Sequence, residues 1–316
     1  MARTTALFAL VVFSVLYGSN QEDLPLSAAQ ESEIEGAAAM LEGDRSLQKS
    51  ALAVHPSPRI AEKQRSKMHA DGCHLSRSKT KSPECVYGNP SSQTTVVLFG
   101  DSHAMHWFPA LNKLAKERNW RLVGLSKSAC PPAKVHRYIA SLRRGYSECD
   151  AWRERTLKRI VQEESPRIVV TSMLNGYQVM RDGRRLGKEA SNRALVEGYV
   201  STLKELRGTG AEVVVIKDIP HPDKDIPRCV SHSLDRLQDC ATPRRKAFDH
   251  PPVNDRAAAR VAGVRFINPT PVLCLKKVCP AVIGDVLVYR NGAHLTPTYV
   301  RTLTPWLAKR LPSPTS

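Results

Sequence analysis

Aromatic residues are scarce in this chain, and no basic segment is interleaved with them. Phe, Trp and Tyr make up 6% of the 316 residues, although the formal net charge is +17. The basic residues are scattered in small clusters such as Arg143-Arg144 and Lys276-Lys277. Proteins that bind nucleic acid combine concentrated basic patches with a recognisable motif or aromatic stacking platforms. We therefore expect no nucleic-acid partner, and expect the charge to favour acidic lipid surfaces or acidic glycans.

Metal-ligand spacing and a membrane-spanning run are also missing. There is no Cys-x-x-Cys pair and the histidines do not follow zinc-ligand spacing, so we predict no metal and no other cofactor. The N-terminal apolar run Ala6–Tyr17 follows a short basic start. As a helix it spans about 18 Å, against roughly 30 Å for a bilayer core. We predict a signal peptide or a membrane anchor over residues 1–19.

Cysteine is present in an even number and in neighbouring pairs. Eight cysteines allow many pairings, and the sequence alone does not choose among them. Four short sequential loops are the simplest proposal, each adding roughly 2–4 kcal/mol of stability. Disulfides imply an oxidising compartment, so we expect a periplasmic or other extracytoplasmic protein, secreted or anchored by its N-terminal segment. The proposed pairs are Cys73–Cys85, Cys130–Cys149, Cys229–Cys240 and Cys274–Cys279.

The composition divides the chain into a linker and a domain. Residues 20–71 contain an acidic, Ala-rich stretch, followed by Pro56, Pro58 and a basic run. These features predict a partly disordered linker without a core strand. The following segment, residues 72–312, has the composition and pattern expected of one folded domain.

Within this domain, short apolar runs alternate with amphipathic stretches. This alternation predicts an α/β fold in which helices cover both faces of a central five-stranded parallel sheet. Ligands of such sheets bind outside the carboxyl ends of the strands. The strands are expected at residues 94–99, 121–125, 167–173, 212–217 and 264–267, and the helices at 104–118, 152–164, 192–207, 255–262 and 296–310.

Ser102 directly follows the first predicted strand, within Leu98-Phe99-Gly100-Asp101-Ser102-His103. Backbone N–H groups at the start of a helix stabilise developing negative charge, although a serine there is also a common helix cap. A serine hydroxyl needs an adjacent base to act as a nucleophile. His294 lies in the loop before the last helix, at the same edge of the sheet. The two residues together predict a Ser–His acyl-transfer site.

Two segments resemble the first and last blocks of the SGNH hydrolase family: Val97–Ala104 and Tyr289–Thr296. The sequence is most similar to the SGNH domain fused to membrane acyltransferase-3 proteins, which O-acetylate polysaccharides. The likeness extends from about residue 72 to 312 and includes the segments around the cysteines. It implies a three-layer α/β/α sandwich of the flavodoxin-like SGNH type, supports the four sequential disulfides, and implies a serine-dependent O-acyltransferase or carbohydrate esterase.

The resemblance also implies roles for individual residues. The last block of the family usually carries an aspartate that orients the histidine. Asn291 stands at that position here and brings no negative charge; Asp285 is an alternative acid. A glycine of the second block is replaced by Ser128 or Ala129. The remaining oxyanion or substrate contacts are then expected at Asp101, His103, Asn175 and Ser128.

These observations favour extracytoplasmic O-acetyl transfer or ester hydrolysis on an envelope polysaccharide or glycan. The alternative is a catalytically impaired glycan-binding or accessory domain, because Asn291 lacks the usual charge. The sequence contains no multi-helix membrane domain. The resemblance therefore implies a separate membrane acyltransferase partner, a deacylating role, or a piece of a larger split protein.

Overall fold

The computed structural model describes residues 34–41 and 47–313. The predicted signal peptide or anchor over residues 1–19 lies outside the described residues. The chain from Ile34 onward forms one compact unit. Among the residues described, no helix has both the length and the apolarity needed to cross a membrane.

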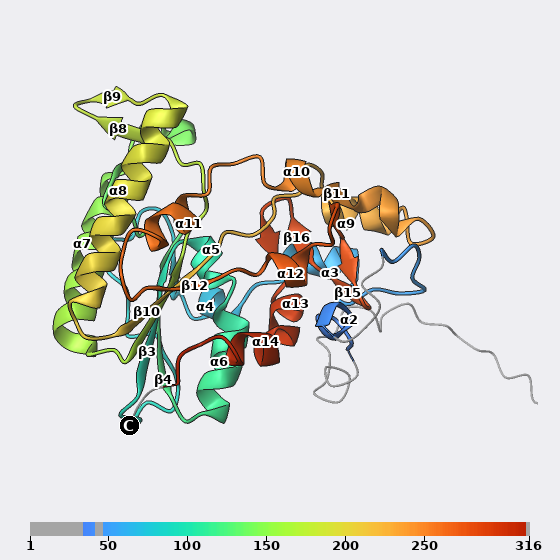
Figure 1. The fold of residues 1–316 in the computed structure, drawn as a ribbon, viewed down its shortest axis with the longest axis horizontal. Helices are drawn as coiled ribbons and strands as arrows, with labels where there is room; N and C mark the ends of the chain where they lie inside the picture. Colours follow the sequence, from blue (N-terminus) through green and yellow to red (C-terminus); the bar gives the residue numbers. More distant parts are fainter. Residues whose placement is uncertain (1–33, 42–46, 314–316) are drawn as a thin grey trace, which may run out of the picture. The chain divides into compact units, whose positions relative to one another are not determined.

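A seven-stranded sheet lies at the centre of this unit, with the strand order β1-β4-β3-β7-β10-β12 and with β2 also paired to β4. The five predicted strands form its parallel centre (Figure 1). Most of their residues are buried, as expected for apolar strands covered on both faces. They are β3 (Thr95–Gly100), β4 (Arg121–Lys127), β7 (Ile168–Ser172), β10 (Glu212–Ile216) and β12 (Arg265–Ile267).

Two short strands extend the sheet beyond the five predicted. The strand β1 (His74–Leu75) runs parallel to β4, and β2 (Val86–Gly88) runs antiparallel to it. The Cys73–Cys85 disulfide joins their starts. The Lys127 ammonium group donates to the carbonyl oxygens of Ser76, Arg77 and Lys79 in the intervening loop, at 2.5–2.9 Å. Strands of two or three residues are too short to show an alternating pattern, which is why the sequence predicted five strands instead of seven.

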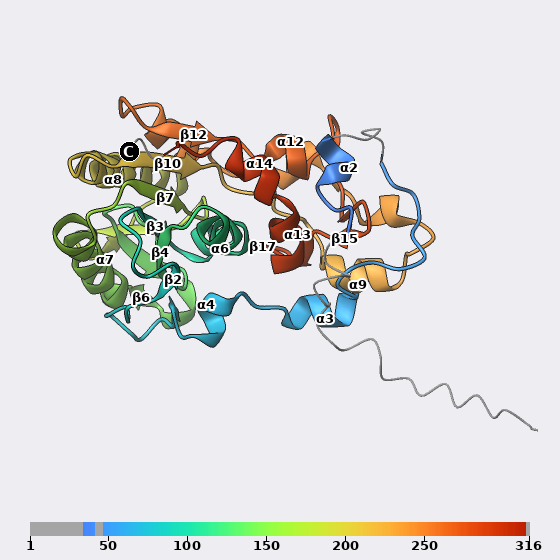
Figure 2. The same ribbon diagram turned by 90° about the horizontal axis from the view of Figure 1, so that it is seen from below.

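Helices cover both faces of the sheet, which confirms the three-layer α/β/α architecture (Figure 2). One apolar cluster contains residues of α5, α6, α13 and α14, and the other contains residues of α7, α8 and α11. Two predicted helices are each divided in two, and Pro109 and Pro305 lie in the first turn of the second part, where proline is favoured. The bounds are α5 Ser102–Met105, α6 Phe108–Glu117, α7 Ser147–Arg159, α8 Lys188–Arg207, α11 Val253–Ala258, α13 Pro297–Thr302 and α14 Thr304–Ala308.

Smaller elements decorate the loops. The strands β6, β5, β8 and β9 form a separate four-stranded sheet, and three two-stranded pairs lie in the C-terminal third of the chain. These strands are β5 His136–Ile139, β6 Arg144–Gly145, β8 Val179–Arg181, β9 Arg184–Arg185, β11 Thr242–Pro243, β13 Val278–Cys279, β14 Val282–Ile283, β15 Val286–Leu287, β16 Tyr289–Asn291 and β17 His294–Leu295. The short helices are α9 Ile226–Ser231, α10 Arg244–Ala247 and α12 Thr270–Leu273, and a π-helix, Ile160–Glu164, continues α7.

The described part of the predicted linker, residues 34–41 and 47–71, contains regular structure. This part forms three short helices, and the buried side chains among it join the main core. His55 bonds through its backbone N–H to Asp285 and through its carbonyl to Leu287, at 2.7 and 2.9 Å. The buried residues are widely spaced between polar ones, so no helical or strand period reveals them. The helices are α2 Ala38–Leu41, α3 Pro58–Lys63 and α4 Lys67–Ala70.

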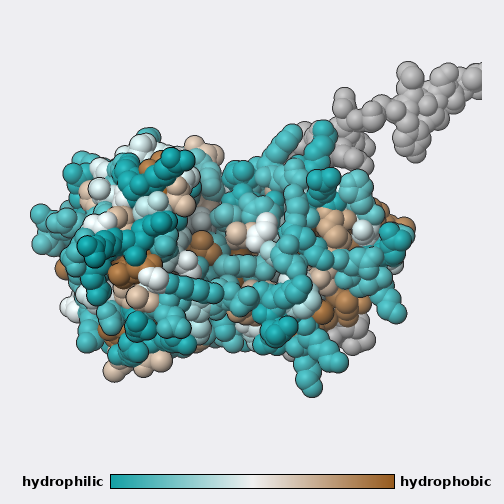
Figure 3. Space-filling view, turned by 90° about the horizontal axis from the view of Figure 1, so that it is seen from above, coloured by the Kyte–Doolittle hydropathy of each residue, from teal (hydrophilic) through white to brown (hydrophobic). Residues whose placement is uncertain are grey.

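All four predicted disulfides are present. The described residues include no free cysteine. The surface seen from above is mostly hydrophilic, and its apolar residues form small separate groups (Figure 3). That view gives no sign of a large apolar patch of the kind that marks a protein or membrane interface.

Candidate active site

Gly100 shapes the turn that leads from the first predicted strand to Ser102. Its φ of 148° lies in a region that side chains disfavour. A Cβ atom there would lie 2.4 Å from the carbonyl oxygen of Ser172 and 2.8 Å from the Cβ of Ala104. Glycine is therefore required for the close approach of β7 and α5 at this point.

Asp101 caps α5 and ties it to the chain beyond β7. One carboxylate oxygen accepts the His103 N–H at 2.8 Å, and the other accepts the Leu174 N–H at 3.0 Å and the Tyr177 hydroxyl at 2.6 Å. The side chain is fully buried. Burial raises the pKa of Asp101, and these hydrogen bonds oppose the rise. The carboxylate thus positions the loop, whereas the sequence suggested an oxyanion or substrate contact.

Ser102, His294 and Asn291 form one hydrogen-bonded series. Ser102 Oγ lies 3.1 Å from His294 Nε2, and His294 Nδ1 lies 3.0 Å from Asn291 Oδ1. Asn291 Oδ1 also accepts the N–H of Ala293 at 2.9 Å. That backbone donor fixes the oxygen of the amide on this side, so Nδ1 of His294 must carry the hydrogen. The lone pair of Nε2 is then directed to the Ser102 hydroxyl, as a general base requires.

The surroundings of His294 keep its imidazole neutral. Burial, the positive charge of His103 and the guanidinium of Arg290 lower the pKa of His294 to about 2. Arg290 itself is 8% exposed, and burial lowers its pKa to about 10. The imidazole is therefore free to accept a proton at neutral pH, although the nearby cations oppose the charged form.

His103 belongs to a second buried pair that sequence reasoning missed. Its Nδ1 lies 2.5 Å from a carboxylate oxygen of Asp218. Burial alone would lower the pKa of His103, but the Asp218 carboxylate overrides this effect and raises it. Burial would raise the pKa of Asp218, but the charge and hydrogen bond of His103 lower it strongly. The signal was the position of Asp218, which follows the carboxyl end of β10 by two residues.

The sequence model of the family "SGNH domain (fused to AT3 domains)" matches residues 72–309. The chain belongs to this family. No curated protein matches the sequence. The matched SGNH region contains the whole Ser102–His294–Asn291 series.

Several solved structures are similar to the chain. The periplasmic domain of the lipopolysaccharide acetyltransferase of Salmonella ser. Paratyphi A has 15% identity and a TM-score of 0.49, covering 76% of this chain and 86% of that chain. A GDSL-like lipase from Bacteroides thetaiotaomicron has 12% identity and a TM-score of 0.38, covering 68% and 86%. TesA has 18% identity and a TM-score of 0.36, covering 69% and 100%.

Membership of the SGNH family supports an enzyme of the acyl-transfer or hydrolase kind. The fusion of family members to AT3 domains suggests an association with a membrane acyltransferase and a glycan. The four disulfides of the SGNH domain are typical of an oxidising compartment and suggest an extracytoplasmic location.

The SGNH domain offers backbone and amide donors around the serine. The N–H of Ser102 has no acceptor among the described residues. The N–H of Ser128 is donated to Leu75 at 2.9 Å, whereas the N–H of Ala129 has no acceptor in this part of the chain. Of the two residues expected to replace the second-block glycine, only Ala129 thus offers a free backbone donor. Asn175 accepts the Val253 N–H through Oδ1 at 3.2 Å, which leaves its NH2 group to donate.

Asp285, the alternative acid, lies elsewhere. Its carboxylate accepts the N–H of Gly36 at 3.2 Å in the turn between β14 and β15. Asn291 therefore remains the residue that orients His294. A large cavity between the β1–β2 loop and α7 is lined by none of the Ser102, His294 or Asn291 side chains.

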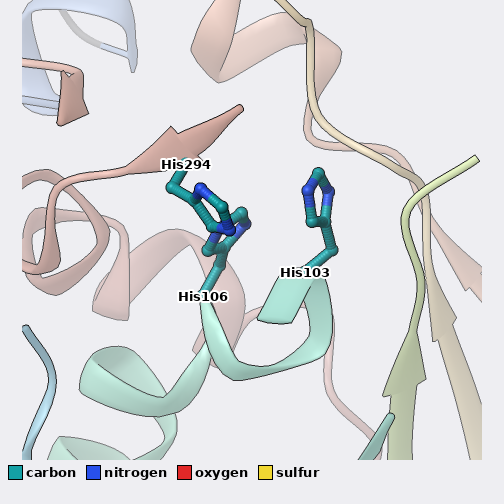
Figure 4. Close-up of side chains that lie close together, drawn as sticks. All are labelled: His103, His106 and His294. Atoms are coloured by element: carbon teal, nitrogen blue, oxygen red, sulfur yellow. The ribbon is translucent and has the colours of Figure 1, made fainter. Parts of the chain in front are cut away.

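His106 was not singled out as functional by the sequence, yet it lies beside the base. Its ring centroid is 5.2 Å from that of His294 and 4.7 Å from that of His103 (Figure 4). The side chain is 4% exposed, and neither ring nitrogen has a hydrogen-bond partner in the part of the chain that the structure describes. Together with Arg290 and His69 it lines a small cavity.

Proposed function

We propose that this SGNH domain transfers an acyl group through an ester of Ser102. The observation that carries the proposal is the 3.1 Å contact between Ser102 Oγ and His294 Nε2, with His294 Nδ1 held by Asn291. A serine activated by a histidine that a third group orients is the arrangement used for covalent acyl transfer. We assign Ser102 as nucleophile, His294 as general base and Asn291 as the orienting residue.

The reaction follows from these roles. Ser102 Oγ attacks the acyl carbonyl carbon while His294 Nε2 takes the hydroxyl proton. The carbonyl oxygen becomes an oxyanion, for which the N–H groups of Ser102 and Ala129 and the side-chain amide of Asn175 are the proposed donors. His294 returns the proton to the leaving oxygen, which leaves an acyl ester on Ser102. An acceptor hydroxyl then gives its proton to His294 and attacks the ester, and Ser102 regains its proton.

The proposed acceptor is a hydroxyl of an envelope polysaccharide or glycan, with water as the acceptor in the esterase version. The disulfides, the family's fusion to AT3 domains and the high net positive charge support an extracytoplasmic glycan substrate and a membrane acyltransferase partner. An acidic glycan suits the net charge of +17.

Hydrolysis of an activated acetyl ester by the purified chain tests this proposal. We expect turnover by the wild type and a loss of several orders of magnitude in Ser102→Ala, since the nucleophile is removed. Ser76→Ala is the matched control, because Ser76 is an exposed serine outside the site. Equal rates for wild type and Ser102→Ala would refute the serine mechanism. Mass spectrometry of an offered oligosaccharide then distinguishes transfer to sugar from hydrolysis.

A second candidate is an accessory glycan-binding domain with impaired catalysis. It is favoured by Asn291, which supplies no charge to stabilise the His294 cation, and by the cationic surroundings of that histidine. Glycan binding by a chain that forms no acyl-enzyme under any acyl donor would support it.

A further inference from the structure

Three histidines converge beside Ser102. The candidate ligand atoms of His103, His106 and His294 all lie within 4.8 Å of one another, and the rings come from α5, its C-terminal end and β17 (Figure 4). The ring centroids are 4.7 to 5.5 Å apart. Residues 103 and 106 are close in sequence, but His294 is far away, which is why spacing along the chain does not reveal the group.

Several ring nitrogens of this histidine group have no hydrogen-bond partner within the described part of the chain. His103 Nε2 and both nitrogens of His106 are buried without a partner among the described residues. Buried polar atoms are nearly always hydrogen-bonded, so exceptions of this kind need an explanation. A cation would bind one lone pair of each ring, and a water molecule could bond either a lone pair or the remaining N–H of His106.

Outer partners orient two of these rings as a metal site requires. His103 directs Nδ1 to the Asp218 carboxylate, and His294 directs Nδ1 to Asn291 Oδ1. In metal sites such partners hold the N–H of one ring nitrogen and leave the other nitrogen to bind the ion. Because Asp218 favours the protonated form of His103, binding of an ion here releases the proton of His103 Nε2 to solvent. The negative charge of Asp218 also offsets part of the repulsion from Arg290. For zinc, N–metal bonds of about 2.0–2.1 Å place two nitrogens roughly 3.3 Å apart, so modest side-chain rotations would close the site.

We propose that His103, His106 and His294 bind a divalent transition-metal ion such as zinc, and that the bound ion inhibits the enzyme. An all-imidazole ligand set selects zinc, copper or nickel over magnesium or calcium. The metal takes the Nε2 lone pair of His294, which is the pair that removes the Ser102 proton. The inhibition rests on the proposed function, whereas the binding does not.

Zinc titration of the purified full chain by calorimetry tests the binding. We expect one zinc ion per chain for the wild type and for Ser102→Ala. His106→Leu is expected to bind more than about tenfold more weakly, since a direct ligand matters at least as much as an outer partner. His232→Leu is the matched control, because His232 is exposed and outside the group. Absence of stoichiometric binding to the wild type, or unchanged affinity in His106→Leu, overturns the site.

Activity measurements test the inhibition separately. Zinc is expected to abolish ester hydrolysis by the wild type, and a chelator to restore it. In His106→Leu, zinc is expected to lower the rate far less, measured against the zinc-free rate of the same variant. Full activity of a zinc-saturated wild type refutes the inhibition. Binding to an inactive wild type would refute the proposed function and leave the site intact. If His106→Leu does not fold, zinc-edge X-ray absorption of the wild type decides the matter: three imidazole ligands support the site, and any other set refutes it.

Discussion

Replacing Asn291 with aspartate changes the charge beside His294 while keeping a hydrogen-bond acceptor of the same size. In a Ser-His-Asp enzyme, the reverse change to asparagine lowers kcat by about 10⁴, because the histidine takes the wrong tautomer. Here the Ala293 N–H holds the Asn291 oxygen toward Nδ1, so the tautomer is already correct. Asn291→Asp can therefore increase kcat only by the difference in strength between a neutral and a charged hydrogen bond to His294.

That difference sets the expected size of the effect. Neutral hydrogen bonds contribute about 0.5–1.5 kcal/mol and charged ones about 1.5–3 kcal/mol, which leaves roughly 1–1.5 kcal/mol. Since about 1.4 kcal/mol corresponds to a factor of ten in rate, Asn291→Asp should raise kcat about tenfold. The assay is steady-state hydrolysis of an activated acetyl ester. Asn291→Ala, which removes the acceptor, should lower kcat instead.

Two outcomes would refute this reasoning. A gain of about a thousandfold or more in Asn291→Asp would mean that the native asparagine does not hold the productive tautomer. No change in either variant would mean that Asn291 does not act on His294 during turnover.

Three further predictions concern charge, packing and the disulfides. Because burial and Arg290 lower the pKa of His294, the acid limb of the pH profile of kcat/KM should lie well below pH 6.5. This limb should move to higher pH in Arg290→Met, and an unmoved limb would contradict the effect of Arg290 on His294. Gly100→Ala should lower the free energy of unfolding, measured in urea, by roughly 1–3 kcal/mol, because the new Cβ would clash with the Ser172 carbonyl oxygen. In the control Gly187→Ala the new Cβ has no atom within 4 Å, so the free energy should hardly change, and equal effects of the two variants would contradict the packing argument. Replacing Cys73 and Cys85 together with serine should cost roughly 2–4 kcal/mol in the same assay, and an unchanged midpoint would mean that the bridge adds no stability.

The fold was largely predictable because its signals are local and strong. The five central strands are buried on both faces and read as continuous apolar runs, as β3 shows with six buried residues. The strands β1 and β2 carry no such signal, because they are held by a disulfide and by Lys127 rather than by their own pattern. Short sequential loops were only the simplest pairing of the cysteines, which the family resemblance supported and the structure confirms.

The site was predictable only where a residue directly follows a strand or precedes a helix in a recognisable block. Ser102 and His294 satisfy that condition, and the structure brings them within hydrogen-bond distance. Asp218 follows β10 by two residues, as Ser102 follows β3, but it lies in no recognisable block. The importance of Asp218 and His106 depends on which loops meet at the edge of the sheet. The Ser128 N–H donates to the carbonyl oxygen of Leu75 in β1, a strand that the sequence did not predict.

Residues 47–71 have a consequence for how the domain is delimited. They lie outside the segment matched by the family, yet His55 pairs with the β14–β15 turn and Gln64 donates to Thr298 at 2.7 Å, on either side of His294. A truncated chain that begins at residue 72 would therefore lose these hydrogen bonds to the segments on either side of His294. Sequence differences upstream of the matched segment can therefore change the turnover rate of a family member even where the residues of the shared blocks are the same.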